Sequence, residues 1–237
     1  MIARTRVLDA AFDFMPDDTE ETLVGASPHQ DAIYVLYDGL QHCGPDQGLP
    51  WFVGNQITMI IPRRQGRQAY QPSPDILVHP TLTQADRSSL DVDRDGPPAL
   101  IIEVASPATA RERDLNPRAK PGIYAAINVL EYLVFDPLEQ FIAGHVWARR
   151  LGPSGYDLWL PNAQGRWEST ALGISFLPVG SRLRIYDQQG NLVPTRLERS
   201  AESRQLFERN SQLTEQLEEE RRVRLELEAE LRRLRGE

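Results

Sequence analysis

Apolar residues recur along residues 28–195 in short runs, and their spacing alternates between helical and extended. From 29 to 43 the apolar positions follow a helical period, with Pro28 before them and Gly44-Pro45 after them, which predicts one amphipathic helix. A second helix is expected at 121–129. Apolar runs typical of strands occur at 51–53, 57–61, 75–78, 99–105, 131–135, 141–149, 156–160 and 183–186. Gly54-Asn55 is typical of a tight turn between the first two of these strands. This order of elements predicts an α/β fold with a partly antiparallel, mixed sheet flanked by helices.

Polar segments divide the chain into three parts. Residues 1–27 lack a sustained period and are expected to form an irregular N-terminal arm. Residues 28–195 form the predicted α/β domain, and the Asp-rich stretch 88–98 inside it is interpreted as a loop. Residues 196–237 contain no Pro and are rich in Glu and Arg, which predicts a long C-terminal helix.

The leucines of this last segment follow a heptad pattern that predicts a coiled-coil-like seam. Glu220 and Arg224 occupy core positions in its middle. The pattern is carried by Leu206, Leu213, Leu217, Leu227, Leu231 and Leu234. We expect residues 200–235 to form a homodimer or to bind a partner helix. A single helix that folds back on the domain is the alternative.

Composition limits the kinds of site that the chain can hold. The 237 residues are 41% hydrophobic, as in an ordinary globular protein with a sizeable core. Cys43 is the only cysteine, which excludes an intramolecular disulfide, and with His42 as its only close neighbour it cannot build a structural zinc site. Any metal is therefore expected to bind to oxygen ligands.

Several classes of function are disfavoured by motifs that the sequence lacks. The segment 1–15 carries charges within its apolar positions, unlike a signal peptide, and no stretch is apolar enough to span a membrane, so the cytoplasm is the expected location. Serine hydrolase, zinc protease and nucleotide-binding motifs are absent. The net charge of −8 weakens a nucleic-acid-binding interpretation without excluding it, since a basic groove can exist locally.

Two carboxylates are candidates for a metal site. Asp75 begins one predicted strand, and Glu103 lies within another that is otherwise apolar. Alternation along a strand puts Ile101, Glu103 and Ala105 on one face, so this carboxylate shares a face with core residues. A buried carboxylate needs a cation or hydrogen-bond donors beside it. The pair suits Mg²⁺, with Mn²⁺ as a substitute. The alternative for Glu103 is an edge strand that points it into solvent.

Lys120 is the only lysine among 26 Lys and Arg residues. Pro121 suits the first position of a helix, so Lys120 lies at the entrance of a helix, where an ammonium is well placed to contact a phosphate or an attacking water. Tyr124 follows one helical turn later. It is a candidate substrate contact, with packing as the alternative role.

Arginines flank these residues in the sequence. Arg63, Arg64 and Arg67 precede Asp75, and Arg113 and Arg118 lie between Glu103 and Lys120. Both groups are candidates for binding phosphates of a nucleic acid. Solvated loop charge is the alternative for each of them.

The chain resembles a known family in a series of ordered motifs. They are Pro74-Asp75, Glu103-Val104-Ala105-Ser106-Pro107, Asp114-Leu115, Lys120, Tyr124 and the strand Glu131-Tyr132-Leu133-Val134-Phe135 with Asp136-Pro137. In this order the motifs resemble the Uma-two-type endonucleases of the PD-(D/E)XK, restriction-endonuclease-like superfamily. The resemblance covers roughly residues 28 to 195.

The resemblance implies a restriction-endonuclease-like fold and a specific set of roles. Asp75 and Glu103 would ligate the metal, with the main-chain carbonyl of Val104 as a third ligand. The superfamily's usual lysine two residues after the Glu is replaced by Ala105. The resemblance implies that Lys120 takes its place from the following helix.

These observations lead to two hypotheses of different classes. The first is a Mg²⁺-dependent DNA endonuclease in which Asp75, Glu103 and Lys120 are catalytic. The second is a catalytically inactive nuclease-fold protein that acts through its C-terminal coiled coil. The net charge and Ala105 favour the second hypothesis, and the order of the motifs favours the first.

Overall fold

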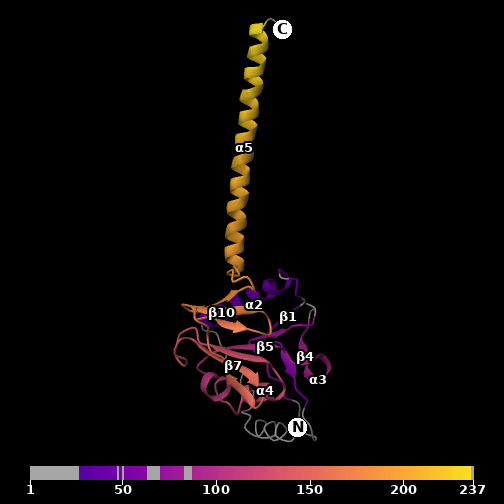
Figure 1. Ribbon diagram of the computed structural model, residues 1–237, viewed down its shortest axis with the longest axis vertical. Coiled ribbons are helices and arrows are strands. Elements are labelled where there is room, and N and C mark those ends of the chain that lie inside the picture. The colour runs from indigo at the N-terminus through magenta and orange to yellow at the C-terminus, as the bar shows by residue number, and fades with distance from the viewer. Residues whose placement is uncertain (1–26, 47, 50, 63–69, 83–86, 236–237) are drawn as a thin grey trace. The chain divides into compact units, whose positions relative to one another are not determined.

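A six-stranded mixed sheet forms the centre of the fold in the computed structural model (Figure 1). The structure describes residues 27–46, 48–49, 51–62, 70–82 and 87–235. The strand order of the sheet is β1-β3-β5-β6-β7-β8. The strands are β1 (Phe52–Asn55), β3 (Ile76–His79), β5 (Leu100–Val104), β6 (Glu131–Phe135), β7 (Val146–Gly152) and β8 (Gly155–Leu158). Only β5 and β6 run parallel, and the other neighbours are antiparallel. The predicted mixed, partly antiparallel α/β fold is confirmed.

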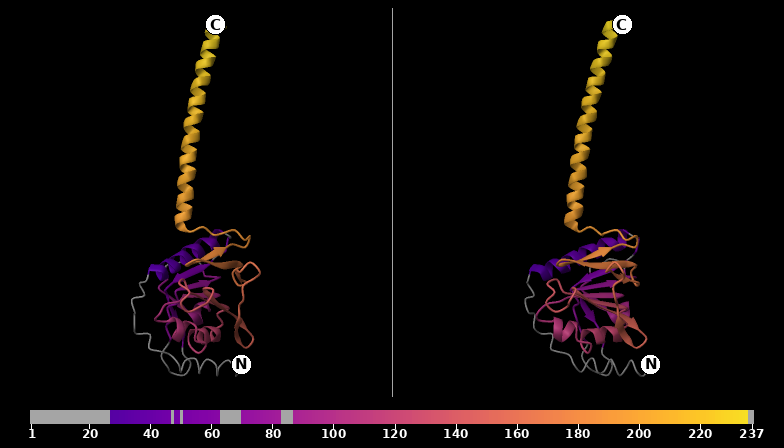
Figure 2. Two further views of the ribbon diagram at one scale, coloured as in Figure 1. Left: turned by 90° about the vertical axis from the view of Figure 1, so that its left-hand side faces the viewer. Right: turned by 60° about the vertical axis from the view of Figure 1, so that its left-hand side comes forward.

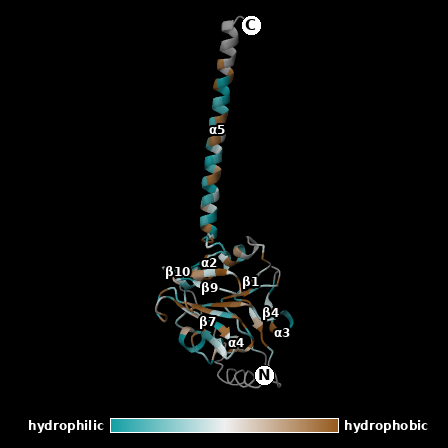
Figure 3. Cartoon of the chain, viewed as in Figure 1, coloured by the Kyte–Doolittle hydropathy of each residue, from teal (hydrophilic) through white to brown (hydrophobic). Residues whose placement is uncertain are grey.

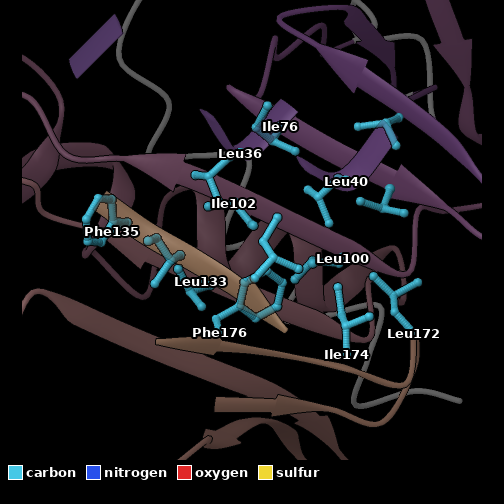
Figure 4. Packing of buried hydrophobic residues seen from close by; sticks show 14 of the residues in the cluster. Leu36, Leu40, Ile76, Leu100, Ile102, Leu133, Phe135, Leu172, Ile174 and Phe176 are labelled. Carbon is cyan, nitrogen blue, oxygen red and sulfur yellow. The ribbon is translucent and has the colours of Figure 1, made fainter. Parts of the chain in front are cut away.

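One face of this sheet is covered by a helix and a second sheet. Helix α2 (Ser27–Asp46) packs beside the three-stranded sheet of β9 (Trp167–Ser169), β10 (Ile174–Val179) and β11 (Arg182–Tyr186) (Figure 2). Leu36 and Leu40 of α2 meet Leu100 and Ile102 of β5 and Phe176 of β10 in one buried cluster (Figure 4). All five side chains are fully buried, so this face is held by apolar packing.

The opposite face is covered by shorter elements. They are β2 (Thr58–Ile60) paired with β4 (Ser89–Asp91), α3 (Val92–Asp95), the π-helical turn η1 (Ala110–Asp114) and α4 (Lys120–Ala126). Met59, Leu90 and Ile123 pack here with Ile101 of β5. Alternation along β5 thus sends Leu100 to one cluster and Ile101 to the other, as the sequence predicted.

The chain divides into two compact units, Met1–Val193 and Pro194–Glu237. The second unit contains the predicted long helix, α5 (Arg196–Arg235), and this prediction is confirmed. In Figure 3 this helix is mostly hydrophilic, with apolar residues dispersed along it. Among the described residues no helix combines the length and the apolar character needed to cross a membrane. The predicted irregular arm lies outside the described residues, except for Ser27, which begins α2.

The predicted turn at Gly54-Asn55 is wrong. Both residues belong to β1, and the positive φ of 49° occurs at Gln56. Gly54 is explained by packing, because a Cβ there would lie 2.8 Å from the Ile57 side chain. Strands β1 and β2 therefore do not form a hairpin: β1 pairs with β3, and β2 pairs in parallel with β4.

Other element boundaries also differ from the prediction. The stretch 88–98 is more than a loop, because Leu90 of β4 is fully buried and Asp91 caps α3 by accepting hydrogen bonds from two backbone N–H groups. Strands β9 and β10 were not predicted. The strand expected at 141–149 begins only at Val146, because the Asp136 carboxylate accepts backbone N–H groups of Phe141 and Ile142 and holds that segment as a turn.

Candidate active site

Asp75 and Glu103 lie next to each other because their strands are neighbours. Asp75 immediately precedes β3, and the antiparallel register of β3 and β5 places Ile76 opposite Ile102. The backbone N–H of Asp75 donates to Glu103 Oε2 at 3.3 Å, and the backbone N–H of Val104 donates to Asp75 Oδ2 at 2.8 Å. The side chain of Gln56 donates to the other oxygen of Asp75 at 3.4 Å. Backbone geometry therefore fixes both carboxylates.

Lys120 joins this pair from the first residue of α4. Its Nζ lies 3.1 Å from Glu103 Oε1 and 2.9 Å from Asp114 Oδ1. The side chain is buried, as are those of Glu103 and Asp114. Pro121 suits the first turn of α4, because proline lacks the backbone N–H that would have no partner at that position. The helix therefore begins at Lys120. The structure thus brings Asp75, Glu103 and Lys120 into one cluster.

Asp114 is a member of this cluster that the sequence interpretation did not assign to the site. It ends the π-helical turn η1, where its backbone N–H donates to the carbonyl of Thr109 at 3.1 Å. The hydroxyl of Tyr132 on β6 donates to the carbonyl of Asp114 at 3.0 Å. These two bonds fix the backbone that carries the carboxylate. The motif Asp114-Leu115 was the available signal, but spacing alone did not show that the side chain reaches Lys120.

Tyr124 is a buried structural neighbour of Glu103. Its hydroxyl donates to Glu103 Oε1 at 3.1 Å, and its ring lies 5.4 Å from that of Tyr132. The side chain is fully buried, so in this conformation it packs and orients the carboxylate. The alternative that the sequence left open, a packing role, is the one that this geometry favours.

The cluster holds more negative than positive charge. Burial raises the pKa of Glu103 to about 8, and the neighbouring Asp114 and Asp75 carboxylates add to this effect against the opposing influence of Lys120. Burial likewise raises the pKa of Asp75. Burial by itself would lower the pKa of the Lys120 ammonium, but the carboxylates of Glu103 and Asp114 outweigh it, and the pKa is raised. A cluster of three carboxylates and one ammonium favours a further cation or a bound proton.

His29 is a second residue that the sequence interpretation did not assign to the site. It lies near the start of α2 and is buried, and its Nδ1 has no hydrogen-bond partner. Its charge, when present, lowers the pKa of Asp75, which places the imidazole within electrostatic range of that carboxylate. Nothing in the spacing of His29 from Asp75 predicted this proximity, because it depends on how α2 crosses the sheet.

The predicted arginine clusters are placed only in part. Arg63, Arg64 and Arg67 lie outside the described residues. Arg118 is exposed and Arg113 half-buried, both in the segment between Glu103 and Lys120. Their role in binding phosphates stays a prediction.

The donor set suits a hard divalent cation. Carboxylate oxygens and a main-chain carbonyl are the ligands that Mg²⁺ prefers, and it usually takes only one or two protein carboxylates. Asp75 is the partly exposed member of the cluster. Among the described residues no group of three or more His, Cys, Asp or Glu side chains is arranged to hold a metal ion. The predicted ligand set of Asp75, Glu103 and the Val104 carbonyl stays a prediction.

Comparisons with known proteins identify the family. A family model, Uma2, described as "Putative restriction endonuclease", matches residues 17–231, so the chain belongs to this family. No curated protein matches the chain. The chain is similar to a crystal structure described as that of "a putative nuclease belonging to DUF820" from Anabaena variabilis ATCC 29413, at 12% identity and a TM-score of 0.36, covering 75% of this chain and 76% of that one. Membership of this family supports the interpretation of the chain as a nuclease.

Proposed function

We propose that the protein is a Mg²⁺-dependent DNA endonuclease that hydrolyses phosphodiester bonds in the manner of the PD-(D/E)XK enzymes. The observation that carries the proposal is the cluster of Asp75, Glu103, Asp114 and Lys120, in which the ammonium contacts Glu103 and Asp114 while backbone hydrogen bonds hold Asp75 beside Glu103. Such an excess of carboxylates is costly for the fold unless a cation or a proton neutralises it. Its presence in a chain of a restriction-endonuclease family supports this reaction.

Each residue of the cluster has its own role in the proposed reaction. Asp75 and Glu103 would hold the cation with the Val104 carbonyl, and a bound Mg²⁺ supplies a Lewis acid that neutralises charge on the phosphate. Lys120 contacts Glu103 and Asp114, and its remaining N–H would orient the attacking water and stabilise charge on the phosphate oxygens. Asp114 and Tyr124 are positioning residues: Asp114 holds the Lys120 ammonium, and Tyr124 holds one oxygen of Glu103.

Cleavage of supercoiled plasmid by the purified full-length chain tests the proposal. Mg²⁺ or Mn²⁺ should support nicking, and EDTA should abolish it. Glu103→Gln should lower the rate at least about 100-fold, because it removes a charged cation ligand without changing the shape of the side chain. Glu112→Gln makes the same change at an exposed position between Glu103 and Lys120. It is the matched control and should leave the rate unchanged. Cleavage by Glu103→Gln at the wild-type rate would refute the assignment.

A second candidate function is that of an interaction protein with a nuclease fold and no catalysis. The exposed apolar residues of α5, such as Leu213 and Leu217, favour it. Calorimetric titration with Mn²⁺ discriminates between the two, because a protein without a cation site has no reason to bind the ion. Binding by the wild type that is lost in Glu103→Gln supports the endonuclease. Lack of binding by the wild type, with or without DNA, supports the interaction protein.

A further inference from the structure

Helix α5 carries a heptad seam from residue 206 to residue 234, in which leucines occupy six of the nine core positions. One series of core positions is 206, 213, 220, 227 and 234, and the second is 210, 217, 224 and 231. Leu213, Leu217 and Leu227 belong to this seam and are 48%, 66% and 56% exposed. A helix shows such a stripe when another helix covers it.

Two charged residues at the middle of the seam restrict what can cover it. Glu220 and Arg224 are successive core positions, and both are exposed. In a parallel pair of identical helices, each core residue faces its own copy, so Glu220 would meet Glu220 and Arg224 would meet Arg224. In an antiparallel pair, each position of the first series faces a position of the second. Glu220 then meets Arg224 of the other copy, twice, and like charges are replaced by opposite ones.

The antiparallel alignment that pairs these charges also pairs the leucines. Its twofold axis passes level with residue 222. Leu217 then faces Leu227 of the other copy, and Leu213 faces position 231. From position 210 to position 234 the seam is therefore complementary to itself in reverse, whereas Leu206 lies outside the overlap of the two helices.

We propose that α5 binds α5 of a second copy of this chain as an antiparallel coiled coil centred near residue 222. Two positions oppose this orientation. Asn210 would face its own copy in a parallel pair, where buried asparagines pair well, but faces position 234 in the antiparallel one, and Leu206 is paired only in the parallel dimer. Two adjacent layers of like charge outweigh these two losses. This inference does not depend on nuclease activity.

The geometry has a measurable consequence. At 1.5 Å per residue, the two starts of α5 lie about 80 Å apart in the antiparallel dimer, whereas a parallel dimer brings them to within about 10 Å of each other. The two chains therefore enter the helix pair from opposite ends.

The first test is the oligomeric state of the full-length chain by sedimentation equilibrium. The wild type should be a dimer, and Glu220→Arg should raise its dissociation constant by at least roughly tenfold, because each Glu–Arg contact becomes an Arg–Arg contact. The double swap Glu220→Arg with Arg224→Glu should restore the dimer. Glu218→Arg is the matched control, since it makes the same change of charge outside the seam, also four residues before an arginine. A monomeric wild type, or a dimer indifferent to Glu220→Arg, overturns the proposal.

Disulfide trapping tests the direction of the helices. In the antiparallel pair position 217 is about 15 Å along the axis from its own copy, too far for a disulfide, whose Cα atoms must lie within about 7 Å. A mixture of Leu217→Cys and Leu227→Cys chains should crosslink, and neither variant should do so alone. The wild type, whose only cysteine, Cys43, is buried, gives the background. Rapid crosslinking of Leu217→Cys by itself would show a parallel pair and overturn the proposal.

Discussion

Glu103 and Glu131 occupy neighbouring parallel strands and are both buried, yet their carboxylates meet different surroundings. Glu131 points to the face covered by β9 and β10, where it accepts hydrogen bonds from the Ser169 hydroxyl, the Thr170 backbone N–H and the Arg150 guanidinium. Each of its oxygens has a fixed donor. Glu103 points to the opposite face, where it shares the Lys120 ammonium with the Asp114 carboxylate and lies beside Asp75.

The difference shows that a buried carboxylate is not in itself a sign of function. Glu131 connects β6 to the second sheet, and its charge is matched by neutral donors and one arginine. Glu103 is held by its neighbours but not neutralised by them, and its pKa is raised to about 8 by burial. An excess of like charge is what marks a candidate site, and the following changes test that distinction.

The largest effect is expected for Lys120→Met. The variant keeps the length of the side chain but leaves Glu103 and Asp114 without their buried counter-charge, so the free energy of unfolding should fall by about 4 kcal/mol. Urea denaturation in EDTA measures this loss. Lys120→Arg keeps the charge and should lose less. Equal stability of Lys120→Met and wild type at pH 8 would show that the ion pairs do not hold the cluster.

Glu131→Gln should lower the free energy of unfolding by about 3 kcal/mol, because it removes a charge that several donors converge on. Cation binding at the other face of the sheet should persist in protein that is still folded. Urea denaturation and Mn²⁺ calorimetry on the same preparation check both parts. Loss of Mn²⁺ affinity with unchanged stability would reverse the roles of the two glutamates.

Glu103→Gln should change stability little at neutral pH in EDTA while removing Mn²⁺ binding. Because the folded protein holds the proton of Glu103 at a pKa of about 8 rather than the ordinary 4.5, its contribution to stability is complete below 4.5 and is lost as the pH rises through about 8. Wild-type stability should therefore decline relative to the variant across that range. Parallel pH profiles of the two proteins would contradict this assignment.

The smallest effect is expected at His79, away from both glutamates. Its Nε2 lies 3.0 Å from the Asp95 carbonyl, and the Thr81 N–H donates to its Nδ1, which suits a neutral ring. Burial lowers the pKa of His79 below 6.5, so stability present above 6.5 should be lost as the pH falls through the folded value. His79→Gln should therefore reduce the difference in stability between pH 5 and pH 7.5, as measured by urea denaturation at the two pH values.

The sequence predicted the parts of the fold that depend on local pattern. The fully buried run around Glu103, the strand 131–135 and the long helix from 196 are set by apolar period and length, and all three form. The missed strands β9 and β10 are short or contain polar residues, and pairing decides them. The turn predicted at Gly54 was wrong because a glycine is needed there for close packing against Ile57 and not for a turn.

The residues of the candidate site also fall into two groups, those that the sequence could predict and those that it could not. Asp75, Glu103 and Lys120 could be chosen from residue type and context, and the structure brings them together, although their catalytic roles stay predictions. Asp114 and His29 could not be added, because their proximity arises from a π-helical turn and from the crossing of α2 over the sheet. Sequence spacing carries neither kind of information.

The π-helical turn η1 has a consequence for changes in chain length. The turn is held by hydrogen bonds that span five residues, from the Asp114 N–H to the Thr109 carbonyl and from the Leu115 N–H to the Ala110 carbonyl. Deleting one residue from Ala110–Asp114 would break this pattern and change the direction of the Asp114 side chain, because one residue of a helical turn corresponds to about 100° around the axis. The contact between Asp114 and Lys120 therefore depends on the number of residues in the turn as much as on the identity of the two side chains. A relative that conserves both side chains but is one residue shorter here would have to hold its lysine by other means.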